Sequence, residues 1–129
     1  MAVTLINAEG LPELDVYHHV AVATGSRTIH LAGQVDWSGA PDLATQVENA
    51  YVNVHTALRA AGASFKDLVR IRVFVVDWTP EQMPELLQGL ENARRRVGED
   101  ARPPASLIGV AALDVPEHRV EIEAVAVLD

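Results

Sequence analysis

The sequence contains no cysteine among its 129 residues. This absence excludes disulfide bonds, thiolate nucleophiles and cysteine-bound zinc, and it is compatible with a reducing compartment such as the cytoplasm. The sequence also lacks an apolar run that approaches the ~20 residues of a membrane-spanning helix. No secretory signal precedes its first apolar segments. We therefore expect a soluble, cytoplasmic protein without a membrane partner.

Basic residues are also few. The sequence has ten Lys and Arg and eighteen Asp and Glu, which gives a formal net charge of −8. Nucleic-acid binding requires a basic surface that displaces counterions from phosphates, so we expect no nucleic-acid partner. Arg94–Arg96 form the one basic cluster, and their side chains would point in different directions on a helix, which favours a solvated helix end. Hydrophobic residues make up 49% of the chain, which predicts one folded domain over residues 1–129.

Apolar periodicity divides the chain into strands and helices. Strands are predicted at His18–Thr24, Thr28–Trp37, Leu68–Asp77, Ala105–Asp114 and His118–Asp129. The turn Gly25–Arg27 predicts that the first two of these form a hairpin. One helix is expected from about Asp42 to Ala61, and a second runs from the capping sequence TPEQ, which begins at Thr79, to about Val97. This order of elements is typical of an α+β fold.

The strand predicted at Ala105–Asp114 is apolar on both faces, with Leu107 and Leu113 on one and Ile108 and Val110 on the other. Two helices can cover only one face of a single sheet, so something else must cover the second face. Another copy of the chain is the economical candidate, and we therefore expect an oligomer.

Several kinds of site find no support in the sequence. Its five histidines form no helical i, i+4 pair, and the adjacent His18 and His19 would point to opposite faces of a strand, so we expect no metal site. The sequence has no glycine-rich phosphate loop, and no serine lies in a G-x-S-x-G context.

Two carboxylates near the C-terminus need an explanation. Glu121 and Glu123 lie two residues apart in the apolar stretch VEIEAVAV, so in a strand they share one face. They could lie on a solvated face, pair with Arg70 and Arg72 of another strand, or belong to a functional site. The residues alone leave these three alternatives open.

Several segments carry a family resemblance. Gly33-Gln34-Val35 ends a strand, Gln46 and Asn53 lie in the first helix, and the run NVHTALRAAGASFKDLVRIRVFVVD is followed by LIGVAAL and the terminal VEIEAVAV. From roughly Tyr17 to Val127 the sequence resembles the RidA/YjgF family. The resemblance implies a chorismate-mutase-like α+β fold, with a mixed six-stranded sheet and two helices on one face. It also implies a homotrimer whose sheets form a central barrel with small-molecule clefts between subunits.

The resemblance also implies a chemistry. Well-known members of the family hydrolyse reactive enamine or imine intermediates without a cofactor, because an ordered carboxylate positions water for attack on the iminium carbon. By position, Glu121 matches this carboxylate, Tyr17 matches the cleft tyrosine, and Gly33 matches the backbone that contacts substrate. Glu123 has no such counterpart.

The cleft of this chain departs from the family pattern. Ala105 stands where the deaminases carry the arginine that clamps a substrate carboxylate, Leu107 replaces a cysteine, and Glu85 falls near the position of an asparagine. Arg102 could replace the lost arginine only if the proline turn that follows it carries the side chain inward.

Two functions are therefore expected. The first is hydrolysis of an enamine or imine, or a related water addition, on a metabolite that needs no amino-acid-type carboxylate clamp, with Glu121 as the catalytic residue. The alternative is a trimer of the same fold that binds a small molecule or acts like a chaperone without catalysis.

Overall fold

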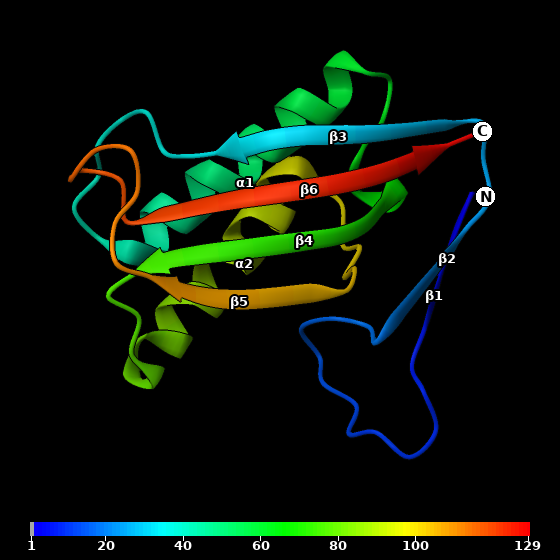
Figure 1. The fold of residues 1–129 in the computed structure, drawn as a ribbon, viewed down its shortest axis with the longest axis horizontal. Helices are drawn as coiled ribbons and strands as arrows, with labels where there is room; N and C mark the ends of the chain where they lie inside the picture. Colours follow the sequence, from blue (N-terminus) through cyan, green and yellow to red (C-terminus); the bar gives the residue numbers. More distant parts are fainter. Residues whose placement is uncertain (1) are drawn as a thin grey trace.

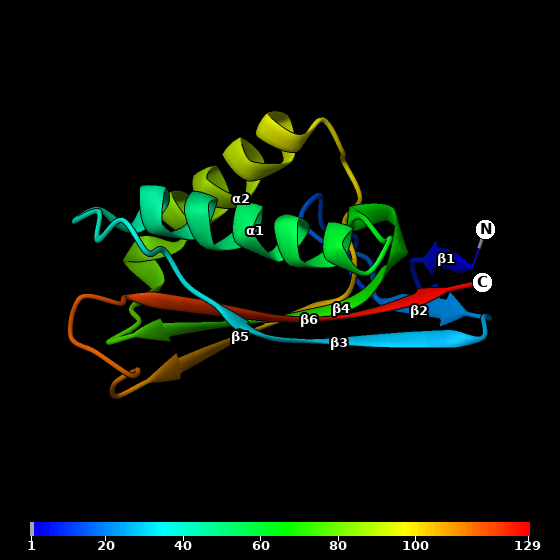
Figure 2. The ribbon, with the colours of Figure 1, turned by 90° about the horizontal axis from the view of Figure 1, so that it is seen from above.

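The computed structural model describes residues 2–129 and places both helices on one face of a four-stranded sheet (Figures 1 and 2). The strands are β1 Val3–Ile6, β2 Val20–Ala23, β3 Arg27–Gln34, β4 Leu68–Val76, β5 Ala105–Val110 and β6 Val120–Leu128. The helices are α1 Leu43–Ala60 and α2 Met83–Val97, with 3-10 turns at Phe65–Asp67 and Pro80–Gln82. The main sheet has the order β3-β6-β4-β5, in which only β4 and β5 are parallel. The predicted α+β fold with two helices on one face is confirmed, and its six strands are divided between this mixed four-stranded sheet and a second sheet of two strands.

The remaining strands, β1 and β2, form a separate two-stranded sheet that projects from the main sheet (Figure 1). We call residues 3–23 the arm. The predicted hairpin between His18–Thr24 and Thr28–Trp37 is wrong, because β2 pairs with β1 and β3 pairs with β6. At Gly25 a methyl group would overlap the Leu128 carbonyl, so the chain passes closely against the end of β6 and leads β3 into the main sheet. The strand β1 was not predicted, because its four residues are too short to show a period.

Capping residues set the helix boundaries. The Asp42 carboxylate accepts a hydrogen bond from the Thr45 N–H at 3.0 Å and starts α1. The second helix starts at Met83, later than the predicted Thr79, because the Thr79 capping box closes a 3-10 turn first. Gly98, with a φ of 73°, ends α2 in the left-handed conformation. Neither of the helices described here is long and apolar enough to cross a membrane.

The hydrophobic core fills the space between the helices and the main sheet. The helices approach closely at Gly89, where a methyl group would lie 2.6 Å from the Ala44 carbonyl oxygen. The Tyr51 ring of α1 stacks on Phe65 with a centroid distance of 4.3 Å. A cavity with a mainly apolar lining lies between α2 and the strands β4 and β5.

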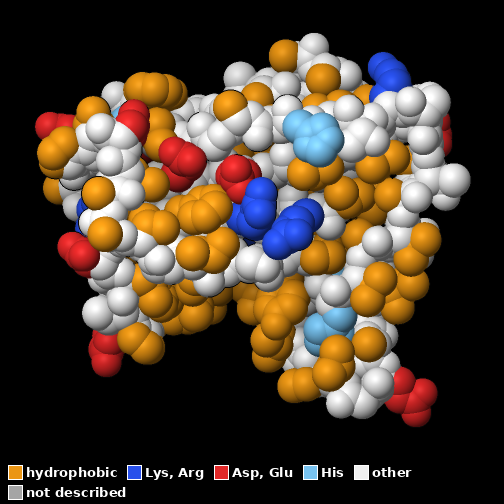
Figure 3. All heavy atoms as spheres, viewed as in Figure 1, with side chains coloured by type: hydrophobic (Ala, Val, Ile, Leu, Met, Phe, Trp, Pro, Cys, Tyr) orange, Lys and Arg blue, Asp and Glu red, His pale blue; other side chains and the backbone are white. Residues whose placement is uncertain are grey.

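The opposite face of the main sheet is left uncovered by the chain itself. Side chains alternate along β4 and β6, so Ile71 and Ile122 point toward the helices, whereas Arg72, Phe74 and Glu121 point away and are exposed or half-buried. Figure 3 looks onto this face and shows charged side chains near its centre with hydrophobic ones around them.

The strand that was predicted to be apolar on both faces is shorter than expected. It ends at Val110, its Leu107 packs against the core, and Ile108 on the uncovered face is half-buried. The uncovered face is consistent with a partner surface, and the trimer stays a prediction.

Candidate functional site

The main sheet separates the predicted site residues into two groups. Glu121 and Gly33 meet on its uncovered face. Tyr17, Ala105 and Leu107 line a cavity on the helix side, between α2, β5 and the arm. The remaining candidate, Glu85, is exposed in the first turn of α2 and joins neither group.

The Glu121 carboxylate lies directly against the backbone of Gly33. The register of β3 against β6 shifts between Leu31 and Gln34, which marks a β-bulge at this point of the strand. A methyl group at Gly33 would overlap the Glu121 carboxylate, so only glycine allows this approach. The bulge therefore presents main chain next to a carboxylate, an arrangement often found beside active sites.

The two C-terminal glutamates have different surroundings. Glu123 lies opposite Arg72 in the β4–β6 register, and its Oε1 is 2.7 Å from the Arg72 Nε. Glu121 lies opposite Phe74 instead, and none of the ion pairs formed within residues 2–129 includes it. The ladder interpretation is confirmed for Glu123, whereas no cation of residues 2–129 pairs with Glu121 to explain its place in an apolar strand.

On the helix side, the cavity has a volume of about 430 Å³ and a mainly apolar lining. The side chains of Leu86, Leu87 and Leu90 on α2 form one wall, and β4 and β5 form the other. Its size falls within the roughly 300–1,000 Å³ that is usual for small-molecule sites.

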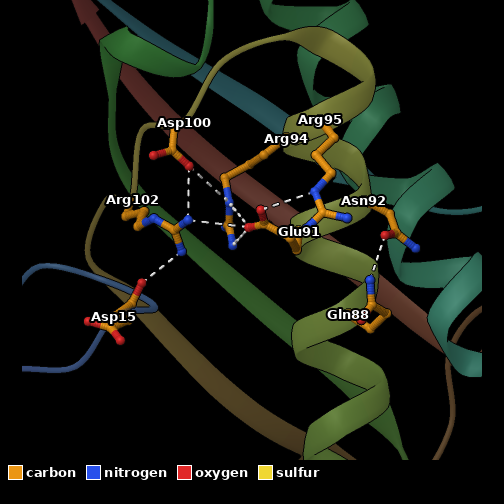
Figure 4. A network of polar contacts seen from close by, with 8 residues as sticks. All are labelled: Asp15, Gln88, Glu91, Asn92, Arg94, Arg95, Asp100 and Arg102. Atoms are coloured by element: carbon orange, nitrogen blue, oxygen red, sulfur yellow. Dashed lines mark hydrogen bonds and ion pairs between the residues drawn. The ribbon is translucent and has the colours of Figure 1, made fainter.

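Arg102 does not replace the missing clamp within the chain. Its Nη1 donates to the Asp15 carbonyl at 2.7 Å, and its Nη2 donates to Asp100 Oδ1 at 2.9 Å and to Glu91 Oε2 at 3.3 Å (Figure 4). The Arg102 carbonyl in turn accepts the backbone N–H of His18 at 3.0 Å. These contacts fasten the arm to α2, and Arg102 is not part of the cavity lining.

Among the polar residues of the cavity, sequence reasoning missed Arg94 and Tyr51. The interpretation of Arg94–Arg96 as a solvated helix end is wrong for Arg94, whose side chain is only 5% exposed. The helical period contained the signal, because Arg94 follows Leu90 by four residues and Leu86 by eight, on the buried face of α2. Tyr51 follows the buried Val47 by four residues on α1, so the helical period indicates its burial but says nothing of its hydroxyl group.

The buried Arg94 guanidinium and burial itself shift the pKa values of two neighbouring groups, Glu91 and Tyr51. Arg94 donates from Nε and Nη2 to Glu91 Oε2 at 3.2 and 3.0 Å. These hydrogen bonds hold the pKa of Glu91 below its ordinary value. Burial raises the pKa of the Tyr51 hydroxyl far above its ordinary value, so Tyr51 is neutral and can donate a hydrogen bond. Within the described residues no three His, Asp or Glu side chains are grouped to hold a metal ion.

Comparisons with known proteins show which family the chain resembles. A family model described as Endoribonuclease L-PSP matches residues 11–128. The crystal structure of YyfB from Yersinia pestis, a protein of unknown function of the conserved Rid family, is 33% identical, with a TM-score of 0.85 over 99% of this chain and 100% of that chain. Rv2704 from Mycobacterium tuberculosis, a member of the YjgF/YER057c/UK114 family, is 29% identical, with a TM-score of 0.65 over 98% and 99% of the two chains.

A more distant structure shares the fold alone. Escherichia coli TdcF with bound serine is 22% identical, with a TM-score of 0.67 over 94% of this chain and 100% of that chain. No curated protein matches the sequence.

Proposed function

Because the chain belongs to the Rid/YjgF family described by the Endoribonuclease L-PSP model, we propose that it hydrolyses an enamine or imine of a metabolite without an amino-acid-type carboxylate beside the reacting carbon. The observation that carries this proposal is the Glu121 carboxylate, which lies against the Gly33 backbone without a cation. A carboxylate in that setting is free to hold and deprotonate a water molecule.

The proposed site is shared between two subunits of a homotrimer. Within one chain the sheet separates Glu121 from the cavity that Tyr17, Ala105 and Leu107 line. A cyclic arrangement would place the uncovered face of one subunit against the open side of its neighbour's cavity. The half-buried apolar side chains on the uncovered face support such an interface.

The reaction needs only water. Glu121 takes a proton from water as the water oxygen bonds to the iminium carbon, and it then returns that proton to the nitrogen. As the carbon–nitrogen bond breaks, Glu121 takes the proton of the new hydroxyl group and passes it to the departing ammonia. Ammonium leaves, and a carbonyl compound remains. No electron is gained or lost, so neither an oxidant nor a reductant is required. Tyr17 provides a hydrogen-bonding wall for the substrate.

The lining of the cavity does not suit small amino-acid imines, such as the one formed from 2-aminoacrylate, as substrates. Their carboxylate would lie beside Ala105, which offers no charge, and Arg102 is held by Asp100 and the arm. A buried carboxylate without a cation is strongly destabilised, so such substrates should bind poorly. RNA cleavage, which the family description names, is not proposed, because the net charge of −8 repels phosphates.

The second candidate is a trimer that binds a small molecule, or acts like a chaperone, without catalysis. The apolar cavity and the alanine at position 105 favour it, because both suit binding and neither contributes to proton transfer.

Ammonia release from a panel of imines formed in situ separates the two candidates. Hydrolysis is supported if the protein turns over a member of the panel and Glu121→Gln lowers that turnover by roughly 10²–10⁴. Glu123→Gln is the matched control on the same strand face, and it should leave turnover almost unchanged. Equal effects of the two substitutions would remove Glu121 from the site, and an inactive panel would favour binding alone.

A further inference from the structure

The best-buried part of the helix-side cavity contains a hydroxyl group without a partner. Tyr51 is fully buried, and its hydroxyl oxygen accepts and donates no hydrogen bond within residues 2–129. The charged groups that act on this hydroxyl most strongly are Arg94 and Arg102. Buried hydroxyl groups in native proteins are nearly always paired, so an orphan in a cavity wall marks the place of an absent partner.

A guanidinium lines the same cavity. Arg94 is 5% exposed, and its contacts with Glu91 use Nε and Nη2, so that Nη1 takes no part in this pair. The surrounding cluster contains the side chains of Arg94, Arg95 and Arg102 together with those of Glu91 and Asp100 (Figure 4). Of these charged groups only the Arg94 guanidinium lines the cavity, and the Arg95 side chain is 71% exposed, so the cation at the cavity wall is Arg94.

The rest of the cavity lining is mainly apolar, with Tyr17 and Ser106 as its other polar residues, and the cavity opens to solvent at a margin of exposed side chains. Leu14 and Met83 at its margin are 46% and 38% exposed, whereas Leu90 and Ile71 are 6% and 3% exposed. A molecule that enters past the exposed margin therefore meets apolar walls first, and it reaches Arg94 and Tyr51 where the cavity is most buried.

We propose that this cavity binds an amphipathic monocarboxylate of medium chain length, with its carboxylate on Arg94 and Tyr51 and its apolar chain along α2 and β5. The carboxylate would pair with the Arg94 guanidinium and accept a hydrogen bond from the Tyr51 hydroxyl. The inference rests on the proposed function in taking the same cavity as the site, and it adds the substrate class. The reacting carbon would lie at the end of the chain remote from the carboxylate, near the open margin.

This placement explains how an enzyme of this family can lack the arginine at position 105. The substrate carboxylate is bound at the buried end of the cavity rather than beside the reacting carbon, so no cation is needed near Ala105. A neutral ligand of the same shape could use Tyr51 but would form no ion pair with Arg94, so the cavity should discriminate in favour of the anion.

Calorimetric titration with octanoate, octanol and octylamine tests the inference on the purified protein. Octanoate should bind at least tenfold more tightly than octanol, and octylamine should bind more weakly than either. None of the three contains an imine, so the result does not depend on hydrolysis. Binding without turnover of any imine would leave the inference standing and refute the proposed function. Turnover of uncharged imines by a protein that binds octanoate no more tightly than octanol would support the proposed function and refute the inference.

Two variants locate the carboxylate. Tyr51→Phe removes only the orphan hydroxyl, so the melting temperature should hold or rise while octanoate affinity falls several-fold. Arg94→Met keeps the length of the side chain and should lower the affinity by at least thirtyfold. Arg96→Met is the control, because Arg96 lies two residues away, pairs with Glu48 and is outside the cavity. Equal binding of octanoate and octanol, or unchanged octanoate binding in both cavity variants, would overturn the inference.

Discussion

A methyl group added at Gly33 should displace the Glu121 carboxylate without unfolding the protein. The three atoms nearest to the added carbon all belong to the Glu121 side chain, with Cγ at 2.6 Å. Gly33 is not among the glycines with positive φ, so its backbone accepts alanine. The glutamate must leave its rotamer, which costs about 0.5–1.5 kcal/mol. Alanine also restricts the unfolded chain, which stabilises the fold by about 0.4–1 kcal/mol.

These two effects nearly cancel, so Gly33→Ala should change the free energy of unfolding by less than about 1 kcal/mol in urea titrations. Turnover of an imine identified in the panel should nevertheless fall by roughly 10²–10⁴, because the displaced carboxylate no longer positions water. The double variant Gly33→Ala/Glu121→Gln should be no slower than Glu121→Gln alone, because both changes remove the same function.

Gly109→Ala provides the control. Gly109 lies on β5, and its added carbon would meet only the Trp78 Cβ at 3.2 Å, so turnover should not change. Full turnover of Gly33→Ala would refute the reasoning, because the clash would then have been relieved without moving the carboxylate. Additive losses in the double variant would refute it as well, since they would show that Gly33 and Glu121 act separately.

Four further outcomes are expected. Light scattering should give three times the 13.9 kDa of one chain, and a stable monomer at micromolar concentration would contradict the trimer. The imine derived from 2-aminoacrylate should be hydrolysed on the order of 10²-fold less efficiently than by arginine-bearing relatives, and Ala105→Arg should recover part of that loss in ammonia-release assays. Arg72→Ala should lower the free energy of unfolding by about 1 kcal/mol or less, since its pair with Glu123 is partly exposed. Because the pKa of Glu91 is lowered, its ionised carboxylate stabilises the fold fully above about pH 4.5, and this stabilisation is lost as the pH falls below that value. The melting temperature of Glu91→Gln should therefore decrease less between neutral and acidic pH than that of the parent protein.

The sequence predicted those helices and strands whose pattern depends on residues close together in the chain. The alternation of Leu68–Asp77, the helix from about Asp42 to Ala61 and the end of the second helix near Val97 depend on neighbours within a few residues, and the structure confirms them. The pairing of β2 was missed because it depends on the passage of Gly25 beside Leu128, more than a hundred positions away. Close approach between distant segments leaves no periodic trace in the sequence.

The site was predicted unevenly for the same reason. The family resemblance identified Glu121 as a candidate site residue. Only the structure shows that Glu121 lies opposite Phe74 of β4, while Arg72 forms an ion pair with Glu123. The burial of Arg94 was readable in principle from the helical period, but a cluster of consecutive arginines indicated solvent more strongly. The orphan hydroxyl of Tyr51 depends on what fills the space between layers, which no sequence pattern encodes.

Mixing two inactive variants decides whether Glu121 of one subunit acts on a molecule held in the cavity of its neighbour. Glu121→Gln removes the proposed base, and Ala105→Trp fills the cavity, so each homotrimer alone should be inactive. In mixed trimers assembled from equal amounts, each cleft has an even chance of an intact base and an even chance of an intact cavity. Turnover should therefore return to about one quarter of the parent value after subunit exchange. A mixture that stays as inactive as its components would contradict a site shared between subunits.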